Sequence, residues 1–171
     1  SDAVTLLQQY KNQIGFQYFD HKPITSPDSI FPEDLAVTLL MNSQVGWRAF
    51  QSLQQYAHTF DLSTLPVLPL EQTSAEERQS IAAVIARLAQ LPGIAASVAT
   101  KLLHKKRPAL IPILDNQAIF GAYLNPKWPQ KPAYRDSIKD LALISKALEW
   151  ITYDLTRPVN ISAWEHLSEL E

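Results

Sequence analysis

The residues with the clearest capacity for chemistry lie in one stretch, residues 91–121, which reads LPGIAASVATKLLHKKRPALIPILDNQAIFG. A single carboxylate, Asp115, follows an apolar run and precedes a segment with helical spacing. An ionised carboxylate can stabilise positive charge that develops on a sugar, and it can position an attacking water. Aspartate is also a common helix cap, because it accepts hydrogen bonds from free backbone N–H groups. The two interpretations are compatible, and both stay open.

A tight turn precedes the first helix of this stretch. Residues 91–95 lie between two helical segments, and Pro92 and Gly93 allow the chain to reverse there. The turn places backbone N–H groups at the N-terminus of the helix that starts near Ala95, which makes an anion site suited to phosphate. Spacing then predicts two faces for that helix. The inward face holds Val98, Ala99, Leu102 and Leu103, and the other holds Ser97, Lys101, His104 and Lys105.

Basic residues concentrate around and after this helix. The chain has a formal net charge of −2, yet residues 101–139 contain eight basic and only two acidic side chains. This asymmetry indicates an anionic ligand on one side of the protein. We expect Lys105, Lys106 and Arg107 to contact phosphate groups, which would give salt-sensitive affinity without sequence preference. The alternative is a solvated helix end, where cations are favoured by the helix dipole.

The elements that must position these residues are predicted to be helices. Apolar residues recur at helical spacing almost throughout, and no run alternates long enough to require a sheet. Ser74 and Glu77 form a capping box, so a helix should run from Ser74 to about Gln90. Residues 15–24 are left open between a short strand and a loop. The other expected helices begin at Pro32, after Gly46, near Arg135 (ending at Thr156), and at Ser162.

The chain is expected to form one all-α domain, residues 1–171, with two helical lobes. Two proline-rich connectors, residues 62–74 and 125–134, divide the helices. One lobe should combine residues 1–70 with the C-terminal helices at 134–171. The other should hold residues 71–133, including the turn at 91–95. A cleft between lobes is the default place for a ligand.

Composition excludes several classes of site. The sequence contains no cysteine, which removes disulfides, cysteine-ligated zinc and iron–sulfur clusters. Its four histidines are scattered rather than one helical turn apart, so we expect no metal site and no cofactor. No apolar run approaches the length of a membrane span. We therefore expect a cytoplasmic protein without a membrane partner.

The turn and the aspartate together resemble the helix-hairpin-helix superfamily of DNA glycosylases. The first part of the motif reads Leu-Pro-Gly-Ile-Ala at residues 91–95, and the second reads Ile-Pro-Ile-Leu-Asp at 111–115. The interval from Ser97 to Asp115 matches the family's spacing between its lysine position and its catalytic aspartate. The resemblance implies double-stranded DNA as the partner and Asp115 as the catalytic residue of base excision repair on a flipped nucleotide. It also implies DNA contacts from Gly93, Ile94, Ala95, Ser97, Lys101, Lys105, Lys106 and Arg107.

Two positions depart from the family pattern. Ala95 replaces the second glycine of the hairpin, which adds a side chain where the turn would approach phosphate. Ser97 occupies the position of the Schiff-base lysine in strand-cleaving members, so that nucleophile is absent. The resemblance thus implies a monofunctional DNA N-glycosylase without lyase activity. The run from Lys101 to Pro108 also resembles a group of uncharacterised bacterial proteins, in which the fold could serve another task.

Alternatives from other functional classes stay open. The chain could be a catalytically silent DNA-binding module, or a protein-interaction module such as an antitoxin or immunity factor. Trp128 lies between two lysines in a proline-rich segment and is a candidate for stacking on a base. Trp47, Tyr134, Trp150 and Trp164 could also include a base-stacking platform or a wedge for a flipped nucleotide, but they are expected to lie mostly in the core. The oligomeric state and the identity of any lesion do not follow from the sequence.

Overall fold

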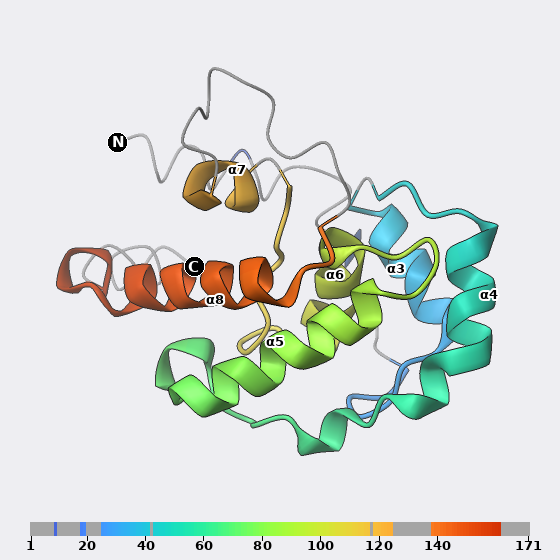
Figure 1. Ribbon diagram of the computed structural model, residues 1–171, viewed down its shortest axis with the longest axis horizontal. Coiled ribbons are helices and arrows are strands. Elements are labelled where there is room, and N and C mark those ends of the chain that lie inside the picture. The colour runs from blue at the N-terminus through green and yellow to red at the C-terminus, as the bar shows by residue number, and fades with distance from the viewer. Residues whose placement is uncertain are drawn as a thin grey trace.

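The computed structural model describes residues 9, 18–19, 25–41, 43–116, 118–124 and 138–161, and its helices confirm the all-α class (Figure 1). No strand occurs in these ranges, where Ser29 and Asp61 make one isolated β-bridge. The α-helices are α3 (Leu35–Leu39), α4 (Trp47–Tyr56), α5 (Ala75–Ala89), α6 (Ala96–Lys106), α7 (Ile119–Leu124) and α8 (Leu141–Thr156). Four 3-10 turns join them: η1 (Pro32–Asp34), η2 (Ala57–Thr59), η3 (Leu62–Thr64) and η4 (Leu70–Gln72).

Local signals correctly located the start of α5. The Ser74 hydroxyl accepts a hydrogen bond from the Glu77 N–H at 3.1 Å, and the Glu77 carboxylate accepts one from the Ser74 N–H at 2.7 Å. This is the predicted capping box, and α5 ends at Ala89, close to the expected Gln90. These two hydrogen bonds satisfy backbone N–H groups that have no partner within the helix, and they define its first turn.

The start of α8 was predicted too early. Asp140 has extended backbone angles, and its carboxylate accepts a hydrogen bond from the Leu143 N–H at 2.9 Å, so it is the N-cap. The helix therefore begins at Leu141 rather than near Arg135, and it ends at Thr156 as expected. The connector at 125–134, most of residues 15–24 and the expected helix from Ser162 lie outside the described residues.

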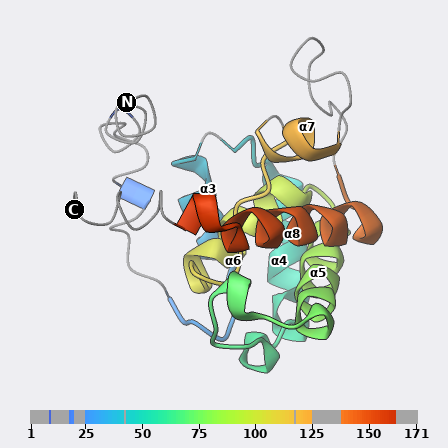
Figure 2. The same cartoon turned by 90° about the vertical axis from the view of Figure 1, so that its left-hand side faces the viewer.

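One core joins the elements that the sequence had divided between two lobes. Buried residues from Ile30 to Leu148 form a single hydrophobic cluster. Helix α6 packs against α3 and α5, while α8 packs against α5 and α7, as both views show (Figures 1 and 2). Helix α8 was expected in one lobe with residues 1–70; in the described residues it packs on α5 and α7 and also on η4, and the division into lobes stays a prediction. None of the described helices has the length and apolarity needed to cross a membrane.

Candidate nucleic-acid interface

The predicted hairpin is present between α5 and α6, and Gly93 is required at its tip. Gly93 has a φ of +82°, in the left-handed region that favours glycine. A Cβ atom there would also lie 2.7 Å from the backbone nitrogen of Ala49, on α4. Pro92 and Gly93 are exposed, whereas Ile94 is buried in the core. The turn is thus anchored through Ile94 and presents its tip to solvent.

Contacts on two sides hold the hairpin in place. The Ser52 hydroxyl of α4 donates a hydrogen bond to the Pro92 carbonyl at 2.9 Å. On the other side, the Ala96 N–H donates to the Ile138 carbonyl at 2.8 Å, just before α8. The Gln90 side-chain amide donates to the Lys139 carbonyl at 3.0 Å. Two segments distant in sequence, α4 and residues 138–139, therefore fix the conformation of the turn.

The N-terminus of α6 has the features of an anion site. Ala95 is the N-cap, and no side chain caps this helix. Within the described part of the chain, the backbone N–H groups of Ala95 and Ser97 have no hydrogen-bond acceptor. Free N–H groups and the helix dipole favour a negatively charged ligand at such a position. The start of α6 is therefore a candidate site for an anion.

Asp115 caps the turn that leads into α7. Its carboxylate accepts a hydrogen bond from the Ala118 N–H at 3.0 Å, which confirms the capping interpretation. The preceding N–H, on Leu114, donates to the Thr100 hydroxyl of α6 at 3.0 Å. Asp115 is therefore placed alongside the first two turns of α6 and is half-buried. A catalytic role is compatible with this position and stays a prediction.

Lys101 is buried in contacts with the protein itself, which contradicts the DNA contact expected from it. Only 7% of the residue is exposed, and its ammonium donates to the Met41 carbonyl at 2.9 Å and to the Ser43 hydroxyl at 3.1 Å. Burial lowers the pKa of Lys101, and the negative charge of Asp115 partly opposes that shift. The side chain thus ties the segment before α4 to α6 and lies within electrostatic reach of Asp115.

Lys106 is also buried, and its predicted phosphate contact is wrong for the same reason. Its ammonium forms an ion pair with Asp34 at 2.8 Å, and the two side chains are only 1% and 8% exposed. It donates a further hydrogen bond to the Thr25 hydroxyl at 2.7 Å. The Asp34 carboxylate additionally accepts from the Phe31 N–H at 2.8 Å and from the Thr25 hydroxyl at 2.9 Å. This network ties the C-terminal end of α6 to η1.

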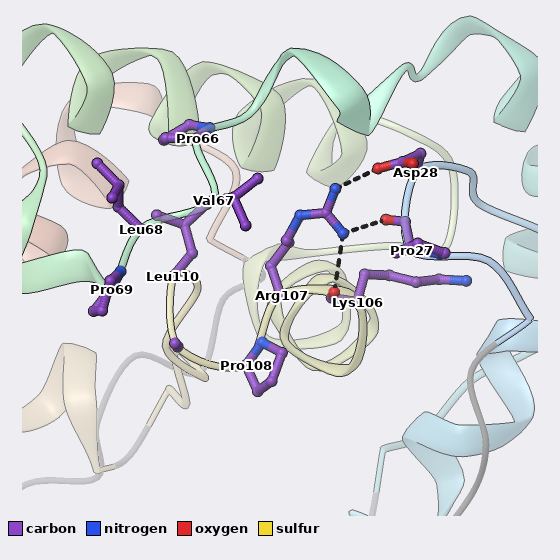
Figure 3. Close-up of a pocket in the computed structure, with 11 residues that line it drawn as sticks. Pro27, Asp28, Pro66, Val67, Leu68, Pro69, Lys106, Arg107, Pro108 and Leu110 are labelled. Atoms are coloured by element: carbon purple, nitrogen blue, oxygen red, sulfur yellow. Dashed lines mark hydrogen bonds and ion pairs between the residues drawn. The ribbon is translucent and has the colours of Figure 1, made fainter.

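The remaining cations of the basic run make protein contacts as well. The Lys105 ammonium donates to the Phe19 carbonyl and lies 5.2 Å from the centre of the Phe19 ring. Arg107 pairs with Asp28 and donates to the Pro27 carbonyl at 2.8 Å (Figure 3). The basic run therefore holds the N-terminal segment against α6 instead of facing solvent. Helical periodicity could not reveal this, because the partners lie about 80 residues away in sequence.

The chain has a recognised family. A family model matches residues 3–151, and its description is "Family of unknown function (DUF6308)". The protein belongs to this family. No curated protein and no solved structure matches the chain. The family description assigns no activity to its members.

Two cavities lie away from the hairpin and Asp115. The first, of about 430 Å³, lies at the C-terminal end of α6 (Figure 3). Its walls are mainly apolar, formed by residues 66–69 and 108–110 with Pro27, Asp28, Lys106 and Arg107. The second, of about 510 Å³, lies between residues 28–32 and the C-terminal half of α4. Neither cavity is lined by the hairpin or by Asp115.

Two tryptophans that were expected in the core are exposed. Trp47 is 67% exposed at the N-terminus of α4, and Trp150 is 42% exposed on α8. Trp128, the predicted base-stacking residue, lies outside the described residues. Among those residues, no group of three or more His, Asp or Glu side chains could hold a metal ion.

Proposed function

We propose that this protein binds double-stranded DNA through the helix-hairpin-helix element made by α5, residues 91–95 and α6. One observation carries the proposal: an exposed glycine turn leads into a helix N-terminus that lacks a side-chain cap and has free N–H groups. A DNA phosphate is the ligand that these groups favour. The resemblance to the glycosylase superfamily at residues 91–115 supports the same partner.

The charge of this region also supports a polyanionic ligand. Residues 78–114, which include most of α5, the hairpin and α6, contain six basic side chains and no aspartate or glutamate. Four of those cations, Lys101, Lys105, Lys106 and Arg107, make the internal contacts described above. Asp34 and Asp28 neutralise Lys106 and Arg107, so the field that lowers the cost of approach for a phosphate comes from the other cations of this region. The dependence of binding on salt should accordingly be shallow.

For Asp115 we propose a second role, in monofunctional removal of a base. Its carboxylate would stabilise the oxocarbenium-like sugar while the N-glycosidic bond breaks. The base would leave with the bonding electron pair, a water would add its hydroxyl to the sugar carbon, and the proton released by that water would end on the base. The position of Asp115 beside the first two turns of α6 supports this role. Its capping bond to Ala118 supports the alternative, a catalytically silent DNA-binding module.

A substitution at Ala95 tests the DNA site directly. Ala95 has the extended backbone of an N-cap, so Ala95→Asp should cap α6 and stabilise the protein by about 1 kcal/mol. The new carboxylate would occupy the free N–H groups and repel phosphate. We expect duplex affinity, measured by fluorescence anisotropy, to fall at least tenfold while the melting temperature rises. Unchanged affinity in Ala95→Asp would contradict the proposal.

Two matched variants separate capping from charge. Ala95→Asn supplies a similar cap without charge, so it should weaken DNA binding less than Ala95→Asp. Ala95→Gly restores the hairpin glycine and should keep or improve affinity. Catalysis is tested separately with a duplex that carries a cationic azasugar. If Asp115 faces the sugar, wild type should prefer this duplex and Asp115→Asn should lose the preference; equal binding in both proteins would leave Asp115 as a cap alone.

A further inference from the structure

Helix α4 packs against the hairpin through Ala49 and Ser52 on its buried side, and its outer face carries no acidic residue. Its exposed side chains are polar, cationic or aromatic, and residues 35–60 contain no aspartate or glutamate. Helical spacing places four of them on one face: Trp47, Arg48, Gln51 and Gln55. By contrast, the exposed aromatics of α8, Trp150 and Tyr153, share that helix with Glu149. The charge of the α4 face therefore suits a polyanion.

Trp47 offers a rigid, open aromatic surface on this face. Its ring stacks on Phe50 with 5.3 Å between ring centres and an interplanar angle of 16°. Phe50 is partly buried against the core, so the stack restrains the Trp47 ring while 67% of the residue stays exposed. A restrained aromatic ring with one open side stacks on a nucleobase with little loss of conformational freedom.

The hairpin and α4 form one unit, joined through the middle of the helix. The Gly93 backbone contacts Ala49, and Ser52 is hydrogen-bonded to Pro92, so α4 and the turn hold a fixed relation (Figure 1). Towards the C-terminal end of α4 the charge changes, because His58 shares a cavity with Asp28 and Asp61. A DNA strand anchored at the hairpin would therefore meet the N-terminal half of α4 rather than its other end.

We propose that this half of the α4 face contacts DNA next to an unpaired base, with Trp47 stacking on the base. Arg48 and Gln51 would contact the adjoining backbone. The base must be unpaired, since bases inside a duplex stack on one another and present no open face. This inference rests on the proposed function, because the hairpin supplies the phosphate anchor.

The experiment compares a labelled matched duplex with the same duplex containing a one-base bulge. Wild type should bind the bulged duplex more tightly, and Trp47→Ala should lower that affinity about tenfold with less than a threefold change for the matched duplex. Trp150→Ala, which removes an exposed tryptophan from α8, should leave both affinities unchanged. Gln51→Glu should weaken binding to both duplexes more than Gln79→Glu, which adds the same charge near the far end of α5.

The outcomes separate this inference from the proposed function. Retention of the bulge preference in Trp47→Ala, with Ala95→Asp still losing DNA, would overturn the role of Trp47 and leave the hairpin site standing. Equal losses in Trp47→Ala and Trp150→Ala would also overturn it. Failure of wild type to bind either duplex would overturn both proposals and direct attention to a protein partner.

Discussion

Replacing Lys106 with methionine should destabilise this protein strongly, although Lys106 lies in what the sequence presents as a basic surface run. The substitution keeps the apolar stem of the side chain and removes the ammonium that pairs with Asp34. The carboxylate would then stay buried, at 8% exposure, without its cation. Breaking a buried ion pair in this way typically costs about 3–5 kcal/mol.

The structure places the expected value at the lower end of this range. Asp34 would keep its hydrogen bonds from the Phe31 N–H and the Thr25 hydroxyl, and these two donors would still stabilise its charge in part. We expect the free energy of unfolding to fall by about 3 kcal/mol. With a urea dependence of about 2 kcal/mol per molar, the unfolding midpoint should fall by about 1.5 M. Urea titration followed by far-ultraviolet circular dichroism measures this shift.

Two further variants decide whether the ion pair is the cause. Lys146→Met removes an exposed lysine from α8 and should change stability by less than about 0.5 kcal/mol. Asp34→Asn removes the carboxylate charge that Lys106→Met leaves without a cation. The double variant should therefore lose at least about 1 kcal/mol less unfolding free energy than the sum of the losses in the two single variants. A loss below about 1 kcal/mol in Lys106→Met, or additive single effects, would refute the reasoning.

Two other substitutions follow from the geometry. Gly93→Ala should destabilise by about 2 kcal/mol or more, because its positive φ disfavours a side chain and its Cβ would collide with the Ala49 backbone; a melting temperature within a degree of wild type would contradict this. Burial and the hydrogen bond to Asp154 raise the pKa of Tyr123 to about 12. The folded state then holds this proton more tightly than the unfolded state, so stability should fall as the pH rises from about 10 through about 12. Tyr123→Phe should remove that part of the decline in alkaline urea titrations, and an unchanged pH profile would speak against it.

Some features of this protein follow from residues within a turn or two of one another, and these were predictable. The capping box at Ser74 sets the start of α5, and Pro92 and Gly93 set the hairpin. The capping role of Asp115 was predictable in the same way, because its partner, the Ala118 N–H, lies three residues away. Each depends on hydrogen bonds or backbone angles over at most a few residues, so the local sequence contains the necessary information.

The direction in which a charged or aromatic side chain points was decided only by tertiary structure. By spacing alone, Lys101 and Lys105 share an outward face of α6, and Trp47 resembles a core residue. In the fold, residues 25–34 pack over α6 and bury Lys106, and Met41 and Ser43 contact the buried Lys101, while Trp47, at the end of α4, is exposed. The physical reason is that an ammonium is buried only where acceptors and a counter-charge meet it. Those partners come from chain segments roughly 60 to 80 residues away, and only folding brings them to the helix.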